Sequence, residues 1–310
     1  MNRCPITYEP CGNELYSIQG LNKLSRRLTS LKDFPYSAQE QRREAAVRSA
    51  KMSIQGIQPK ISTRLSPGNQ SFEIVDKGGN YIIKPQSEVF IQVPENEDLT
   101  MKMASAFGIN VPLTGLLYSK DRSLSYFIKR FDRYGKNKKY ALEDFAQLTG
   151  NSRDTKYNWS MEKLLPVIDC YCTFPMIEKR KLFRRTLFCF ITGYEDMHLK
   201  NFSLITKNNI TELSPAYDLL NTTISMEQIT EELALPLVGK KRKITREILF
   251  EYYGKDKMKL NDKILAAEQR NLIEEKETLL NLIDISFLND EMKIKYSDLL
   301  NERYQRLIGK

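Results

Sequence analysis

The sequence lacks the features that mark a membrane or secreted protein. It contains no uninterrupted apolar run of about eighteen residues, the length that begins to span a bilayer. The N-terminus "MNRCPITYEP" has no apolar signal core followed by a small-residue cleavage site. We therefore expect no membrane partner and a cytoplasmic location, with export by a signal-less route left open.

Cysteine and histidine are also scarce. Five cysteines, an odd number spread over 310 residues, do not make a disulfide framework and favour a reducing compartment. Cys4 and Cys11 could supply two of the four ligands of a structural metal site, but no second Cys or His pair lies nearby. Because the only histidine is His198, a structural zinc site is not expected.

What the chain does contain is a sizeable core and an excess of positive charge. Hydrophobic residues make up 41% of the sequence, and the length favours one large domain or two lobes. The 48 Lys+Arg residues outnumber the 39 Asp+Glu residues, which gives a net charge of +9. Such a field favours anionic ligands such as phosphates, nucleic acid or acidic protein surfaces.

The periodicity of apolar residues changes along the chain. Residues 1–50 are polar and basic and predict two short helices separated by Pro35. Short β-branched and aromatic runs divided by turn residues then predict strands at 60–65, 71–75, 81–85, 111–119 and 124–132. A helix at 95–108 interrupts them, with Gly108 as its stop. Residues 1–131 are thus predicted to form a strand-rich N-terminal lobe.

From about residue 141 the pattern becomes helical. It predicts helices at 141–150, 160–172 and 176–193, two short strands at 202–206 and 210–214, and a mostly helix-forming, charged remainder. Residues 132–310 are therefore predicted to form a mainly helical C-terminal lobe. The fold class expected from the residues alone is α+β with two lobes.

The stretch "ITGYEDMHLKNFSL", residues 191–204, gathers polar groups at the end of an apolar helix. Asp196 and Asn201 form D-x-x-x-x-N, and Asp218 follows in "SPAYDLL". This order suits phosphoryl transfer, in which one carboxylate orients the acceptor hydroxyl while an amide oxygen and a second carboxylate hold Mg²⁺. Lys200 lies beside them and would neutralise charge on the transferred group. The spacing predicts a catalytic loop.

A plainer interpretation exists for each of these residues. Asp and Asn are ordinary turn residues, and D-x-x-x-x-N arises by chance in many chains. A lone histidine is more often a structural group than a general base, so we interpret His198 as the residue that orders the catalytic loop. The position of the loop between a buried helix and a two-strand ribbon favours the catalytic interpretation.

A lysine inside a strand is the second candidate. Lys84 in "YIIKPQ" follows three apolar positions, so it either reaches nucleotide phosphates or is a solvated strand edge. The helix that follows carries Glu95, Glu97 and Asp98, any of which could orient the ammonium group, as a helix glutamate does in protein kinases. Glu97 is the predicted partner.

A polar loop enters the first strand of the predicted sheet. The stretch "SIQGIQPK" supplies Ser53, Gln55, Gly56, Gln58 and Lys60, and its backbone N–H groups suit a role over phosphates. It has a single glycine and is neither a G-x-G-x-x-G loop nor a Walker loop. On composition alone it is a turn.

Taken together, these motifs resemble the HipA-type toxin kinases of bacterial toxin–antitoxin systems. "SIQGIQPK", "YIIKP", "ENEDLTMKMASAFGINVP", "FIKRFDR", "EDFAQLTG", "DMHLKNFSLI" and "SPAYDLL" follow that family's order across residues 53–220. Only about fifty residues precede the serine loop, so the chain looks like the compact HipT members. In those members a separate small protein, HipS, supplies the missing N-terminal piece.

The resemblance implies a phosphatidylinositol-kinase-like bilobal fold and Mg-ATP-dependent phosphorylation of serine or threonine. It implies that Asp196 is catalytic, that Asn201 and Asp218 bind the metal, and that Lys84 binds ATP. It further places adenine at a hinge strand, against the backbone of Phe127, Ile128 and Lys129.

The resemblance also implies targets and regulation. Family members phosphorylate aminoacyl-tRNA synthetases, are inhibited by autophosphorylation at the serine loop, and act with a HipB-like DNA-binding antitoxin. Ser53 is the matching autophosphorylation site. The sequence departs from its compact relatives at Gln55, where a second serine or threonine is common, and at Tyr194, where a smaller or amide residue is expected.

Two other functions remain open from the sequence. One is an ATP-binding pseudokinase that regulates partners. The other is a nucleic-acid-binding regulator, suggested by the net charge and by "GKKRKITR" at 239–246, although no helix-turn-helix or zinc finger is evident. Direct nucleic-acid binding without an antitoxin is not expected.

Overall fold

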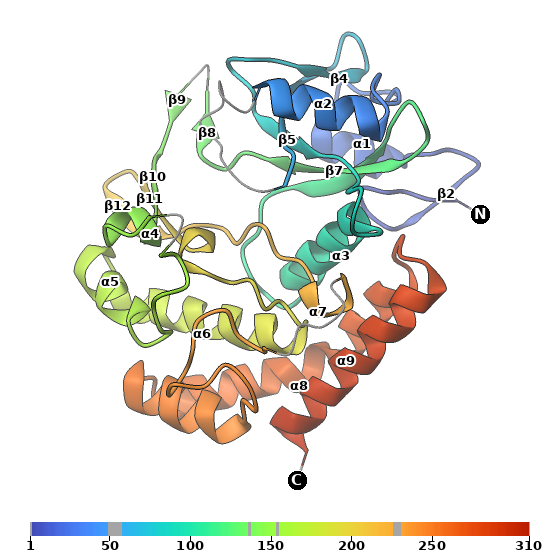
Figure 1. The fold of residues 1–310 in the computed structure, drawn as a ribbon. Helices are drawn as coiled ribbons and strands as arrows, with labels where there is room; N and C mark the ends of the chain where they lie inside the picture. Colours follow the sequence, from blue (N-terminus) through green and yellow to red (C-terminus); the bar gives the residue numbers. More distant parts are fainter. Residues whose placement is uncertain (1, 49–57, 136–137, 153–154, 226–230, 310) are drawn as a thin grey trace. The chain divides into compact units, whose positions relative to one another are not determined.

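The computed structural model describes residues 2–48, 58–135, 138–152, 155–225 and 231–309, which Figure 1 draws in colour. These residues divide into two compact units. The first comprises Met1–Leu99, Pro112–Asn137 and Ile285–Leu288, and the second comprises Thr100–Val111, Lys138–Asp284 and Asn289–Lys310. Each unit is described by itself.

The first unit is built on a five-stranded antiparallel sheet with the strand order β4-β3-β5-β7-β6. Its strands are β3 Ile61–Ser66, β4 Ser71–Ile74, β5 Tyr81–Lys84, β6 Thr114–Tyr118 and β7 Leu124–Lys129. Each predicted strand of this lobe is present. The strands are the short β-branched and aromatic runs from which they were predicted, and consecutive residues of β6 and β7 are buried.

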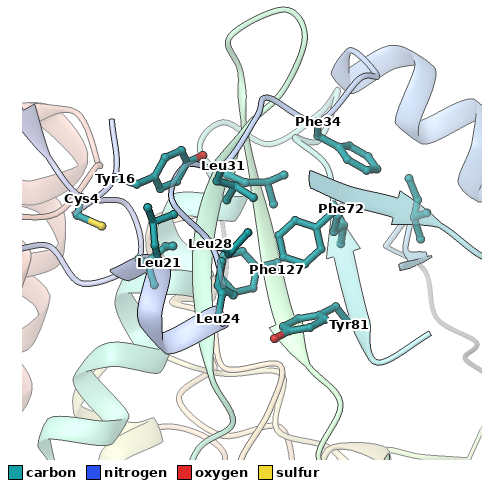
Figure 2. Close-up of a cluster of buried hydrophobic side chains, with 14 of the residues drawn as sticks. Cys4, Tyr16, Leu21, Leu24, Leu28, Leu31, Phe34, Phe72, Tyr81 and Phe127 are labelled. Carbon is teal, nitrogen blue, oxygen red and sulfur yellow. The ribbon is translucent and has the colours of Figure 1, made fainter. Parts of the chain in front are cut away.

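The core of this unit lies against that sheet. Figure 2 shows the rings of Phe72, Tyr81 and Phe127 grouped together, with 5.5 Å between the ring centroids of Phe72 and Phe127. Leucines of the N-terminal segment, among them Leu21 and Leu24, belong to the same buried cluster. The polar first fifty residues therefore contribute part of the core.

Helices α1 Ile18–Leu24 and α2 Ala38–Arg48 are the two predicted helices of the N-terminal segment. The helix-like stretch "NKLSRRL", residues 22–28, indicated a later start for α1. The helix begins at Ile18 because Ser17 caps it, and Oγ of Ser17 accepts from the backbone N–H of Gly20 at 2.9 Å. Two short strands, β1 Asn2–Arg3 and β2 Pro10–Gly12, were not predicted. Strands this short carry no alternating pattern. The two-residue strand β8 Arg133–Tyr134 was missed for the same reason.

Helix α3 Val93–Ala106 lies between β5 and β6 in the chain, and Gly108 after it has φ +78°, as expected for a helix stop. The second unit contains α5 Leu164–Tyr171 and α6 Pro175–Ile191, which match two predicted helices. Its three-stranded antiparallel sheet has the order β10-β11-β12, from β10 Ala141–Asp144, β11 Ser203–Lys207 and β12 Ile210–Leu213.

The helix predicted at 141–150 is wrong over its first half. Residues Ala141–Asp144 form β10 and pair with Ser203–Thr206 of β11, and only the four-residue helix α4 Phe145–Leu148 follows. Asp144 caps α4, with its side chain accepting from the backbone N–H of Gln147. Long-range strand pairing here overrides a local helical pattern.

The C-terminal part of the second unit is mainly helical. Its helices are α7 Thr222–Ser225, a π-helix Ile248–Lys257, α8 Asp262–Asp284 and α9 Asp290–Ile308. The short strand β9 Lys138–Lys139 lies earlier in the chain. Helices α8 and α9 lie side by side (Figure 1). Glu268 on α8 is fully buried and accepts from Arg180 and Arg184 of α6, with Nε–Oε distances of 2.8 and 2.7 Å.

All five cysteines are free. None of the helices in the described part of the chain is long and apolar enough to cross a membrane. Among the same described residues, no cluster of three His, Cys, Asp or Glu side chains is arranged to hold a metal ion.

Candidate active site

The candidate loop begins where α6 ends. Gly193 follows the helix with φ +66°, and a Cβ built on it would lie 2.4 Å from Cδ2 of Leu299 and 2.7 Å from Oγ1 of Thr223. Both the backbone angle and the lack of space require glycine. This tight turn directs the chain into residues 194–201.

Hydrogen bonds join the start of this loop to α7. The backbone N–H of Glu195 donates to Oγ1 of Thr222 at 2.9 Å, and Thr222 Oγ1 donates to the carbonyl of Gly193 at 3.1 Å. Thr223 Oγ1 donates to Oε1 of Glu195 at 2.8 Å. Because α7 follows Asp218 by only a few residues, these bonds hold the two predicted catalytic segments together.

Asp196 projects from this buried loop toward solvent, with 46% of its side chain exposed. Its Oδ2 lies 4.0 Å from Nε2 of His198, and its Oδ1 accepts a hydrogen bond from the hydroxyl of Tyr157. Its backbone carbonyl accepts from Nδ2 of Asn201 at 2.9 Å. The carboxylate thus sits on a fixed backbone at the accessible end of the loop.

Asn201 is buried in a short 3-10 helix, Leu199–Asn201. Its Nδ2 donates to the Tyr194 hydroxyl as well as to the carbonyl of Asp196. These contacts fix the amide nitrogen, so the carbonyl oxygen Oδ1 faces the other way. Tyr194 is only 2% exposed, so its ring is buried.

Asp218 adopts a left-handed backbone conformation, with φ +60°. Asp and Asn tolerate this region better than other residues with a side chain. The half-buried carboxylate lies close enough to His198 that its charge, like that of Asp196, acts to raise the histidine pKa. Burial has the larger effect and lowers the pKa of His198. The imidazole is therefore neutral at neutral pH.

The Asp218 carboxylate and the Asn201 amide oxygen are ligands of the kind that Mg²⁺, which prefers oxygen, binds. The orientation of the Asn201 amide supports this use, because its nitrogen is occupied within the protein. Asp196, His198 and Asn201 lie on one loop of the second unit, and the charge of Asp218 acts on His198. The residues present fit a magnesium ion.

Lys200 is oriented by a residue that the sequence did not single out. Its Nζ lies 3.2 Å from Oδ2 of Asp144, the capping residue of α4. The backbone carbonyl of Lys200 accepts from the Tyr217 hydroxyl at 3.0 Å. The Asp144 contact is not visible in the local sequence, because it depends on the pairing of β10 with β11.

In the first unit, Lys84 pairs with the predicted glutamate. The distance from Lys84 Nζ to Glu97 Oε1 is 2.6 Å, and the two side chains are 4% and 2% exposed. The ammonium also lies 5.5 Å from the ring centroid of Tyr126. Asp98 and Glu95 were the other candidate partners of Lys84. Asp98 accepts from Thr114 Oγ1 at 3.2 Å. Burial raises the pKa of Glu95 to about 7.

The proposed adenine-contact residues lie within the sheet. β7 is flanked by β5 and β6, and Phe127 and Ile128 pair with residues of both neighbours. Their side chains are buried, whereas that of Lys129 is exposed. The backbone groups of Phe127 and Ile128 take part in the strand pairing of the sheet.

Most of the polar loop before β3, including Ser53, Gln55 and Gly56, lies outside the described residues. Gln58 and Lys60 are half-buried just before the strand. The basic run at 239–246 forms a turn and loop with no regular helix before Arg246. It does not provide the recognition helix that would enter a DNA groove.

A pH-dependent contribution to stability is expected from Glu195. Burial raises its pKa to about 7 from an ordinary value of 4.5, against the opposing effects of Thr223 and of Arg303, 3.8 Å away. Because the folded pKa is the higher one, this contribution is full below pH 4.5 and is lost as the pH rises through about 7. We expect Glu195→Gln to gain about 1–3 kcal/mol relative to wild type between pH 5 and pH 8.

Urea unfolding of both proteins at several pH values in this range measures the difference. A wild type that gains stability over the glutamine variant as the pH rises would show that attraction to Arg303 outweighs the cost of burying the charge.

A family model described as "HipA-like C-terminal domain" matches residues 52–280. The "Putative kinase" of Haemophilus influenzae is 32% identical over 261 residues, which cover 77% of this chain and 74% of that protein. The "Serine/threonine-protein kinase toxin HipA" of Shewanella oneidensis is 25% identical over 206 residues, 60% of this chain and 47% of the relative. The chain thus spans less than half of the latter protein.

A solved structure gives the same relationship at the level of the fold. Shewanella oneidensis HipA, in a complex with HipB and its operator DNA, matches with a TM-score of 0.72 and 20% identity, over 91% of this chain and 73% of that one. This match confirms the predicted α+β, kinase-like fold class.

Proposed function

This chain belongs to the HipA-like C-terminal domain family, and we propose that it is a Mg-ATP-dependent protein kinase acting on serine or threonine. The observation that carries the proposal is that Asp196 and Asn201 are joined on one loop, 4.0 Å separates Asp196 Oδ2 from His198 Nε2, and the charge of Asp218 acts on the same histidine. A phosphoryl-transfer enzyme needs a proton acceptor and a set of oxygen ligands at one place, and this loop system offers both.

Asn201 and Asp218 would hold the magnesium ion. The amide nitrogen of Asn201 is fixed by Tyr194 and by the carbonyl of Asp196, which leaves Oδ1 as the ligand atom. When bound, ATP would supply the transferable γ-phosphate, and Mg²⁺ would neutralise part of the phosphate charge. The left-handed backbone of Asp218 sets the direction from which its carboxylate approaches.

Asp196 would accept the proton of the acceptor hydroxyl. Its carboxylate is accessible, while its backbone is held by Asn201 and by the loop's bonds to α7. Lys200, which Asp144 orients, would offset negative charge on the transferred group. His198, buried and neutral, would position the loop rather than exchange protons.

Lys84 would bind the ATP phosphates as a point charge oriented by Glu97. The loop that contains Ser53, Gln55, Gly56, Gln58 and Lys60 would lie over the phosphates. Autophosphorylation of Ser53 would add about −1.5 to −2 charges there and would inactivate the enzyme by repulsion.

The biological role proposed here is that of a toxin kinase of the compact HipT type in the bacterial cytoplasm. Its protein substrate would be an aminoacyl-tRNA synthetase, and its partners would be a HipS-like small protein and a HipB-like antitoxin. The Shewanella relative was solved with HipB, which supports an antitoxin partner.

Phosphate transfer from γ-³²P-labelled ATP to proteins of a bacterial lysate tests the proposal. We expect label on serine or threonine, loss of labelling with EDTA, and at least about a 100-fold loss in Asn201→Ala and Asp218→Asn. The matched control is Asp298→Asn, which changes an exposed carboxylate on α9. ATP binding with no label above background would favour a pseudokinase instead.

A further inference from the structure

Tyr157 has no role in the mechanism above, yet its hydroxyl donates to Oδ1 of Asp196. Its ring lies edge-on to the imidazole of His198, with 5.2 Å between centroids and an angle of 77°. The preceding residue, Lys156, places Nζ 4.8 Å from the tyrosine ring centroid, and its carbonyl accepts from the backbone N–H of Leu199 at 3.3 Å. The segment around Tyr157 therefore packs directly on the candidate catalytic loop.

The contact reproduces the one that a substrate must make. An acceptor serine or threonine has to donate its hydroxyl proton toward a carboxylate oxygen of Asp196 at hydrogen-bond distance. Burial and the neighbouring Asp196 carboxylate raise the pKa of the Tyr157 phenol, so it remains a protonated donor at neutral pH. Tyr157 thus holds a hydroxyl where the reaction requires one.

The exposure of Tyr157 argues against a purely structural role. The residue is 40% exposed, unlike the fully buried tyrosines of the core such as Tyr253 and Tyr296. Removal of the tyrosine hydroxyl from Asp196 would cost one hydrogen bond, which an incoming hydroxyl replaces. An exchange between the two hydroxyls is therefore close to balanced.

We propose that Tyr157 is an acceptor-site residue that occupies the substrate-hydroxyl position on Asp196 until a substrate hydroxyl displaces it. The inference rests on the proposed kinase function and adds to it a determinant of which acceptors react. A serine or threonine that is presented firmly against the loop would displace the phenol. Water, which is small and unanchored, would compete poorly, and this limits wasteful hydrolysis of ATP.

The single histidine provides a test of the contact that needs no catalysis. A protein without a histidine tag gives one imidazole Cε1–H resonance in NMR, that of His198. We expect Tyr157→Ala to shift this resonance because the ring current is lost, and Tyr157→Phe to leave it nearly unchanged because the ring remains. An identical resonance in wild type and Tyr157→Ala would overturn the inference and leave the proposed function standing.

Basal ATP hydrolysis, with water as the acceptor, tests the role of the hydroxyl. Tyr157→Phe is expected to raise kcat for ATP hydrolysis about 3–10-fold with KM for ATP unchanged, because one competing hydrogen bond on Asp196 is gone. If Tyr157→Phe kept the wild-type His198 resonance but hydrolysed ATP with an equal or lower kcat, the proposal would be overturned. The phenol would then only support the loop.

Two further results are also decisive. Phosphotyrosine at position 157 of the wild type, detected by mass spectrometry, would overturn the proposal because the phenol would then be a substrate. No ATP turnover by either protein would remove the proposed kinase function, and this inference with it, whatever the NMR result.

Discussion

Replacement of Asp196 by asparagine is expected to lower kcat for phosphoryl transfer by about 10²–10⁴-fold, the usual contribution of a positioned acid–base group. Asparagine keeps the shape of the side chain and an oxygen that accepts from Tyr157, but it cannot take up the acceptor's proton. The affinity for ATP should stay within about threefold, because the ligands assigned to the metal are unchanged. Radiolabel transfer and ATP titration measure the two quantities.

The same substitution at Asp298 provides the control, because that exposed residue of α9 changes the net charge by the same amount. If Asp196→Asn and Asp298→Asn transferred phosphate at equal rates, Asp196 would not be the proton acceptor. A large loss of ATP affinity in Asp196→Asn would instead place this carboxylate among the metal ligands.

Replacement of Lys84 by methionine is expected to lower the free energy of unfolding by about 3–5 kcal/mol and to abolish phosphate transfer. The ammonium and the Glu97 carboxylate are both almost fully buried and lie 2.6 Å apart. Methionine preserves the volume of the side chain but leaves the Glu97 carboxylate buried without this cation. Urea unfolding measures the loss.

A second substitution separates folding from function. The double variant Lys84→Met/Glu97→Met should recover most of the lost stability, because a buried ion pair replaced by apolar side chains of similar size is often close to neutral. It should remain inactive, because the ammonium group assigned to the ATP phosphates is gone. A double variant that regained activity would contradict the role assigned to Lys84.

The parts of the molecule that local pattern determines were predictable from the sequence. The strands between Ile61 and Lys129 are short β-branched and aromatic runs bounded by turn residues, and α6 carries enough apolar surface to be recognised as a buried helix. The candidate catalytic loop could be proposed from the sequence because Asp196, Lys200 and Asn201 lie within six consecutive residues. Glu97 was chosen from three nearby acids, and the structure gives it the contact with Lys84.

What the sequence did not reveal depends on distant partners. Asp144 contacts Lys200 only because β10 pairs with β11, and the same pairing converts a predicted helix into a strand. Tyr157 reaches Asp196 across thirty-nine positions, and no local periodicity marks it. Such contacts arise from tertiary structure, so a single sequence without its fold carries no direct signal for them.

The turn at Gly193 restricts how this protein can evolve. Two separate obstacles act there, an unfavourable backbone angle for any L-residue with a side chain and crowding by Leu299 and Thr223. A single substitution that makes room beside Gly193, for example at Leu299, leaves the unfavourable backbone angle in place. Diversification of acceptor choice within such a lineage should therefore accumulate in residues that surround the loop, while the entry to the loop itself stays invariant.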